Sequence, residues 1–190
     1  MTSLTTTLRQ TKSTTIVWVV GWALAVTAAA QITMPVPGTP VPFTLQPLVV
    51  VLAGLMLGPV AGAASMLLYL TAGVLGAPVF SPIGAPGIAR LVGPTGGYLI
   101  AYPAAAWIAG MLGSSRSGVD ESTRMGFVRR FVAACAGIAM IFIGGIAQLT
   151  ILTGSFRSAV QLGITPFAAL DIVKALIAAG ASIPRSRPAD

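Results

Sequence analysis

Seventy-seven consecutive residues, from Ser13 to Ala89, carry no charged side chain. Two further uncharged runs cover residues 91–115 and 131–156. A helix needs only about 20 apolar residues to cross the hydrocarbon core of a bilayer. Charged residues make up 8% of the chain, against roughly 25% in soluble domains. These observations predict an integral membrane protein.

Breaks between the apolar stretches predict six transmembrane helices. The first is long and has no separate mature domain after it, so we expect a retained helix rather than a cleaved signal peptide. Six spans in 190 residues leave no room for a soluble catalytic domain, and we expect one all-α membrane domain over residues 1–190. The predicted spans lie near residues 14–33, 45–58, 60–76, 93–113, 128–153 and 162–183.

Basic residues predict how these helices are oriented, because cytoplasmic loops carry an excess of Lys and Arg. Both termini are expected in the cytoplasm, with the connections 34–44, 77–92 and 154–161 on the outer side. The net charge of +7 reflects this asymmetry, and no basic run is long or interleaved with aromatics as nucleic-acid binding would require. Eight basic residues fall on the cytoplasmic side: Arg9, Lys12, Arg116, Arg124, Arg129, Arg130, Arg185 and Arg187.

The segment PVPGTPVPFTLQ, residues 35–46, places four prolines between two apolar stretches. Proline fixes φ and lacks a backbone donor, so this segment is predicted to be neither helix interior nor sheet. A stiff segment with few N–H groups can cover a cavity at membrane depth without leaving donors unpaired. We expect residues 34–46 to form a lid with Thr44 and Gln46 as its polar tips, and the alternative is an exposed polyproline linker.

Two charges interrupt the last apolar run, in the sequence LDIVKAL. Asp171 and Lys174 are three residues apart, so they share one helix face. Each costs roughly 2.5–3.5 kcal/mol at the centre of a membrane helix, and such residues usually face the bundle interior. The alternatives are a polar binding face and a structural ion pair.

Arg90 lies in the same outer half of the expected bundle, before the helix that GPTGGYL begins. An arginine beside a helix N-terminus can bind an anionic group, although an arginine snorkelling to the interface would look the same. One acceptor and two cations suit a small carboxylate ligand that also presents N–H donors.

Four stretches resemble the BioY family, the biotin-specific membrane components of energy-coupling-factor (ECF) vitamin transporters. They are MPVPGTPVPFTLQPL, GAPVFSPIG, RLVGPTGGYLIAYP and DIVKAL. The resemblance implies a six-helix S-component fold in the cytoplasmic membrane that binds biotin near its external face with high affinity. It also implies partners: a coupling membrane protein and two ABC-type ATPase subunits. The chain itself contains no Walker motif, so ATP would be used by those partners, and no cofactor is expected here.

The same resemblance implies roles for individual residues. Asp171 is expected to accept a ureido N–H, Lys174 to donate to the ureido oxygen or the carboxylate, and Arg90 to bind the carboxylate. Tyr98, Thr44 and Gln46 belong to the matching motifs and are expected at the ligand. The small residues Gly21, Ala25 and Ala29 form a stripe on the first helix, a face for close contact with another helix. The resemblance implies that the coupling protein docks on this stripe.

Two other functions remain to be weighed against this one. An intramembrane enzyme is disfavoured, because the sequence has no histidine, one cysteine and four carboxylates. A stand-alone or proton-coupled carrier of a small carboxylate is the stronger alternative, with Asp171 as its titrating group. That carrier would need no ATPase partner.

Overall fold

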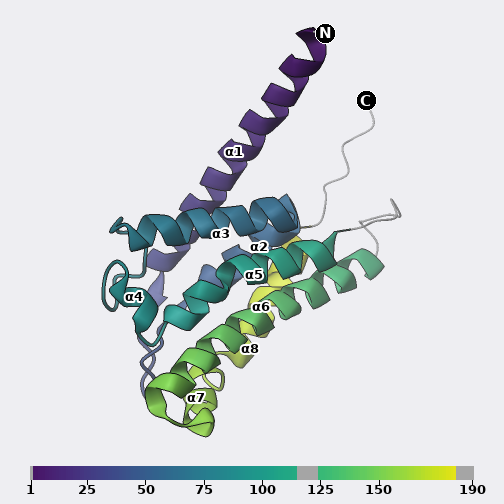
Figure 1. Cartoon of the computed structure of the whole chain (residues 1–190). Helices are drawn as coiled ribbons and strands as arrows, with labels where there is room; N and C mark the ends of the chain where they lie inside the picture. Colours follow the sequence, from purple (N-terminus) through teal and green to yellow (C-terminus); the bar gives the residue numbers. More distant parts are fainter. Residues whose placement is uncertain (1, 115–123, 183–190) are drawn as a thin grey trace.

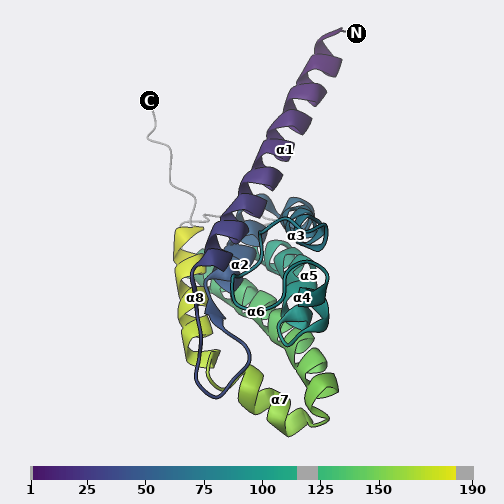
Figure 2. The same cartoon turned by 90° about the vertical axis from the view of Figure 1, so that its left-hand side faces the viewer.

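Apolar stretches form helices throughout the computed structural model of the chain, which describes residues 2–114 and 124–182 (Figures 1 and 2). One short antiparallel pair of strands joins the first two helices. The elements are α1 (Thr2–Gln31), β1 (Thr33–Met34), β2 (Phe43–Thr44), α2 (Gln46–Leu57), α3 (Pro59–Val74), α4 (Ala89–Val92), α5 (Gly96–Gly113), α6 (Arg124–Thr153), α7 (Phe156–Gly163) and α8 (Ala168–Ala181).

Each predicted span overlaps one of the longer helices, but these helices differ in length. Within residues 2–114 and 124–182, α1 and α6 are each long and apolar enough to cross a membrane alone. The bent pair of α7 and α8 meets the same test only when the two are taken together. At 12 and 16 residues, α2 and α3 are apolar but short.

The centre of the bundle is α5, which packs against α2, α3, α4 and α6. Close approach of the backbones depends on glycine. A Cβ on Gly97 of α5 would clash with the carbonyl of Gly144 on α6, and a Cβ on Gly54 of α2 would clash with the carbonyl of Ala106 on α5. Small residues allow this kind of backbone contact between helices in membranes. Figure 1 shows α3, α5 and α6 running alongside one another, with α4 and α7 at their left-hand ends.

The predicted span 162–183 is wrong at its start, because the chain forms two helices there instead of one. The axes of α7 and α8 differ by 54° across the turn that separates them. α7 ends at Gly163, and Pro166 stands in the turn that follows. Proline lacks the N–H needed to continue a helix and disfavours helical φ and ψ in the residue before it, so one continuous helix through this turn is disfavoured. The predicted outer connection 154–161 is also mostly helical, since Ser155 caps α7 by accepting a hydrogen bond from the Ser158 N–H at 3.3 Å.

The proline-rich segment differs in part from its prediction. Phe43 and Thr44 form β2, which pairs with β1 in the register Thr33 to Thr44 and Met34 to Phe43. The four prolines fall outside these paired residues, at 35, 37, 40 and 42, where no strand hydrogen bond is lost. The segment is therefore a hairpin with a stiff, proline-rich tip. We name residues 35–42 the strap.

The first helix extends beyond the rest of the bundle towards its N-terminus in both views (Figures 1 and 2). Its C-terminal half packs on α2 and α3. Of the small-residue stripe, Gly21 is exposed and Ala25 is half-buried, whereas Ala29 is buried within the chain. Ala29 therefore cannot offer a free surface to a partner in this conformation, and the exposed part of the stripe ends at Ala25.

Candidate ligand-binding site

A cavity enclosing about 620 Å³ of empty space, including its opening to solvent, lies among β2, α2, α5 and α8. Apolar and aromatic side chains form most of its wall, including Phe80, Leu99, Ile141 and Phe167. All six residues that the sequence predicts for a ligand line this one cavity: Thr44, Gln46, Arg90, Tyr98, Asp171 and Lys174.

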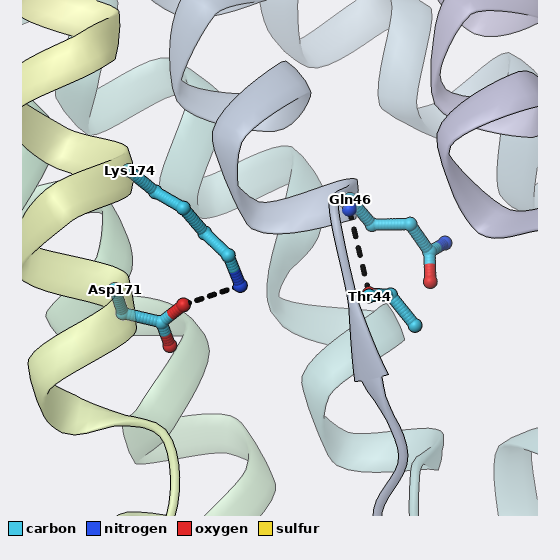
Figure 3. Close-up of polar contacts among 4 residues, drawn as sticks. All are labelled: Thr44, Gln46, Asp171 and Lys174. Atoms are coloured by element: carbon cyan, nitrogen blue, oxygen red, sulfur yellow. Dashed lines mark hydrogen bonds and ion pairs between the residues drawn. The ribbon is translucent and has the colours of Figure 1, made fainter. Parts of the chain in front are cut away.

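Asp171 and Lys174 form an ion pair in the first half of α8, with Lys174 Nζ 2.6 Å from Asp171 Oδ1. Both residues are buried, at 5% exposure each. Lys174 Nζ also lies 4.2 Å from the centre of the Phe43 ring, which stabilises the cation through the ring's negative face. In Figure 3 the pair extends from α8 towards β2 and the beginning of α2. The helical spacing predicted from the sequence is confirmed, and it puts both charges on the cavity wall.

Thr44 and Gln46 approach the cavity from its other side. The Thr44 hydroxyl accepts a hydrogen bond from the Gln46 backbone N–H at 3.4 Å, which links β2 to the first turn of α2. The Gln46 side chain extends away from the ion pair in Figure 3, and its amide donates to the Tyr69 hydroxyl at 2.7 Å. Gln46 is thus held by α3 before any ligand is bound.

Arg90 is buried in the short helix α4, at 6% exposure. Its two terminal guanidinium nitrogens donate to the backbone carbonyls of Ser81 and Ile83, and its Nε is buried without a partner among the described residues. Burial lowers the pKa of the Arg90 guanidinium from its usual value, but an arginine in a protein remains protonated. The sequence predicted that Arg90 binds an anionic group. In the structure, two of its nitrogens already donate hydrogen bonds to carbonyls of the loop before α4.

Tyr98 is held in place by two glycines. Its ring occupies the space that a Cβ on Gly145 would need, and its hydroxyl donates to the Gly163 carbonyl at 3.0 Å. This bond ties α5 to the end of α7. The ring therefore forms a fixed part of the cavity wall.

Sequence reasoning missed an aromatic group that continues this wall. Tyr69 stacks on Tyr102 with ring centres 6.4 Å apart and meets the edge of Phe80 at 5.5 Å. Tyr102 and Phe80 line the cavity directly. Tyr69 stands inside an apolar run where nothing distinguishes a cavity residue from a packing residue. Tyr102 belongs to RLVGPTGGYLIAYP, which pointed to the segment but not to this residue. Phe80 belongs to GAPVFSPIG, which pointed to the loop but not to this residue.

The cavity offers a carboxylate, an ammonium group, an amide and a hydroxyl against aromatic walls. This combination suits a small, partly apolar molecule with both donors and acceptors. Among the residues that the structure describes, no three His, Cys, Asp or Glu side chains gather as metal ligands would.

A bundle of apolar helices around a cavity with largely apolar walls and a few buried polar groups defines a class: helical membrane proteins that bind a small solute. The fold is that of a crystal structure described as the S-component for biotin from an ECF-type ABC transporter, with a TM-score of 0.79, 21% identity and coverage of 91% of this chain and 90% of that one. The BioY family model matches residues 2–188.

Curated relatives agree with the family model. The chain is 43% identical over 139 residues to the probable biotin transporter BioY of Pyrococcus horikoshii, covering 73% of this chain and 76% of that protein. It is 33% identical over 144 residues to the biotin transporter BioY of Thermotoga maritima, covering 76% and 80% respectively. The chain belongs to the BioY family.

Proposed function

We propose that this chain binds biotin in the cavity among β2, α2, α5 and α8, and that it is the substrate-binding component of an ECF transporter. The observation that carries the proposal is that six predicted residues, from three separate stretches of sequence, line the wall of one cavity. Family membership supports the same conclusion, because its named members are biotin transporters. Their transport activity argues for transport rather than catalysis in this chain.

The roles of the charged residues follow from their hydrogen-bonding capacity. A carboxylate has about four lone-pair sites, so Asp171 can accept a ureido N–H while it remains paired with Lys174. Lys174 has three donors and can add a bond to the ureido oxygen or to the carboxylate of biotin. Arg90 is the candidate carboxylate partner through donors that its bonds to the loop carbonyls leave over.

The proposal places the protein as a multi-pass protein in the cytoplasmic membrane, with both termini in the cytoplasm. The six crossings are α1, α2, α3, α5, α6 and the bent pair of α7 and α8. Gly58, with φ of +81°, makes the tight turn that lets α3 fold back on α2, where Gly62 meets Gly54. The positions of the basic residues support this orientation.

The partners follow from the ECF assignment: a coupling membrane protein and two ABC-type ATPase subunits. Docking would use the exposed surface of α1 around Gly21 and Ala25. A stand-alone or proton-coupled carrier needs none of these partners, and no contact in the described residues favours it over the ECF assignment.

Biotin binding is tested with purified protein in detergent from which bound ligand has been removed. Titration calorimetry compares the parent with Asp171→Asn and Lys174→Ala. Arg157→Ala is the matched control, since it also removes a charge but from the exposed surface of α7. We expect tight binding by the parent and the control, and a loss of at least about 100-fold in both cavity variants, because each would leave a buried polar partner without its bond.

The outcomes separate the parts of the proposal. Tight binding that survives both cavity substitutions would keep biotin as ligand and make the ion pair structural. Folded protein that does not bind biotin would refute the proposed function and favour the carrier of another small carboxylate. Uptake in cells with and without the ATPase subunits then tests the ECF assignment, because a proton-coupled carrier would respond to an ionophore instead.

A further inference from the structure

Arg90 separates the ligand cavity from a second cavity. The second one, beneath the loop that joins α3 to α4, contains about 480 Å³ of empty space, including its opening to solvent. Three residues, Phe80, Ser81 and Arg90, line both cavities. The wall between the two is therefore a few side chains thick, and the guanidinium of Arg90 is part of it.

The loop over the second cavity, residues 82–88, is mostly exposed. Ahead of it, Phe80 is anchored to the bundle, because its ring occupies the space above Gly73 and its carbonyl accepts a bond from Gln31 at 3.2 Å. Beyond Phe80, Arg90 bonds the carbonyls of Ser81 and Ile83. Arg90 thus holds the exposed part of the loop to the body of the protein.

Gly84 makes room for this arrangement. Its φ is +111°, and a Cβ added there would clash with the Arg90 guanidinium. Because the atoms in the way are the end of a flexible side chain, a methyl group at this position would displace the guanidinium and leave the helices in place. Gly84 does not line the ligand cavity.

The strap on the other side of the cavity is fixed more firmly. Its flanks pair as β1 and β2, and its prolines stiffen the tip. The Thr39 hydroxyl donates to the Leu162 carbonyl on α7 at 2.7 Å and accepts the Val41 N–H at 3.1 Å. Opening the strap would break the Thr39 bond to Leu162 and expose Val41, which is buried in the core. Opening the loop 82–88, which buries little, breaks the Arg90 bond to the Ile83 carbonyl and the bond from the Ile83 N–H to the Ser81 hydroxyl.

From this contrast we infer that Arg90 is a positioning residue that latches the loop 82–88, and that the ligand reaches its cavity through the second cavity when this latch opens. The inference rests on the proposed function, with biotin as the ligand. The strap then acts as a fixed cover. Arg90 controls how fast the ligand exchanges, in addition to any contact it makes with the bound molecule.

A latch of this kind leaves a kinetic signature. When binding and release both require a sparsely populated open state, both rates scale with the fraction of open protein. Loosening the latch therefore raises the association and dissociation rates together and leaves their ratio nearly unchanged. Loss of a direct ligand contact instead raises the dissociation rate alone.

The test measures stopped-flow association and dissociation of biotin for Gly84→Ala. The matched control is Gly76→Ala, in the same connection, which has an equally strained φ of +97° but nothing within 4 Å of its Cβ position. Thr39→Val loosens the strap instead. We expect both rates to rise about ten-fold in Gly84→Ala with Kd within about three-fold, and no change beyond about two-fold in the other two variants.

Three results would overturn the inference. Rates of Gly84→Ala that equal those of Gly76→Ala would show that the latch does not limit exchange. A rise in dissociation alone would mean that the substitution weakens the bound state. If both rates rise in Thr39→Val and stay unchanged in Gly84→Ala, the ligand enters by opening of the strap and not of the loop 82–88.

A measurement without biotin keeps the latch separate from the proposed function. Cys135 is the single cysteine of the chain, so Ser81→Cys in a Cys135→Ser background gives one thiol at the shared wall. We expect a membrane-impermeant maleimide to label it about ten times faster when Gly84→Ala is added than when Gly76→Ala is added. Equal labelling rates in the two variants would refute the proposal that Arg90 latches the loop, whether or not the protein binds biotin. If Gly84→Ala does not fold, Arg90→Lys in the same background carries the test, since lysine keeps the charge but cannot hold both carbonyls in one planar fork.

Discussion

Removing one member of the buried ion pair on α8 is expected to damage the protein more than removing both. At 2.6 Å the attraction between Lys174 Nζ and Asp171 Oδ1 is about 6 kcal/mol with an effective dielectric constant near 20. Desolvation of each buried ion costs several kcal/mol, so the net contribution of the pair to stability is small. A single substitution leaves the other charge buried without its partner, and such changes cost about 3–5 kcal/mol.

The assay is thermal unfolding in detergent without biotin, for Lys174→Met, Asp171→Asn and the double variant. At about 2–4 °C per kcal/mol for a chain of this size, we expect each single variant to lower Tm by about 6–20 °C. The double variant should recover most of this loss, because the neutral side chains have nearly the same volumes as those they replace. It should still fail to bind biotin.

Two results would contradict this reasoning. Single variants as stable as the parent would mean that water reaches the pair and screens it, so that neither charge depends on the other. A double variant whose loss equals the sum of the single losses would mean that the two residues do not interact, despite the 2.6 Å contact.

Three smaller predictions concern how the cavity is held in shape. Gly97→Ala should lower Tm by the equivalent of about 1–3 kcal/mol, because its methyl group would meet the backbone of α6, whereas Gly180→Ala, with open space around it, should leave stability unchanged or slightly raised. Tyr98→Phe removes the hydrogen bond to the end of α7 and should cost about 1 kcal/mol, seen as faster hydrogen exchange in α7. Gln46→Leu leaves the Tyr69 hydroxyl without its donor and should lower Tm by the equivalent of about 1–3 kcal/mol, while Tyr69→Phe added to it should restore part of the loss.

Much of the helical arrangement could be read from the sequence. Long uncharged runs have to satisfy their backbone groups internally when they lie in a bilayer, and helices do this locally. For this reason α2, α3, α5 and α6 begin and end within a few residues of their predictions. The last span was predicted less well, since Pro166 and the cap at Ser155 were passed over inside an otherwise apolar stretch.

The sequence predicted cavity residues where placing the side chain in a membrane costs free energy. A charge at membrane depth, such as Asp171 or Lys174, has to face a partner or a cavity, and the helical period already put these two on one face. Motif resemblance supplied Thr44, Gln46 and Tyr98, and the structure brings all of them to the same wall. Apolar and aromatic wall residues such as Ile141 and Phe167 have no such cost and lie in none of the matching motifs, so the sequence could not distinguish them from packing residues.

The sequence alone therefore determined the class of protein, the approximate positions of its helices and the charged face of α8, because each follows from local chemistry along a single segment. Only the tertiary structure decided that Arg90 is committed to the carbonyls of Ser81 and Ile83, and that the strap is tied to α7 through Thr39. Ser81 and Ile83 lie nine and seven residues before Arg90 in one irregular connection, and Leu162 lies 123 residues after Thr39. A hydrogen bond acts only within about 3 Å, and the sequence does not specify which carbonyl of an irregular loop or of a distant helix comes that close.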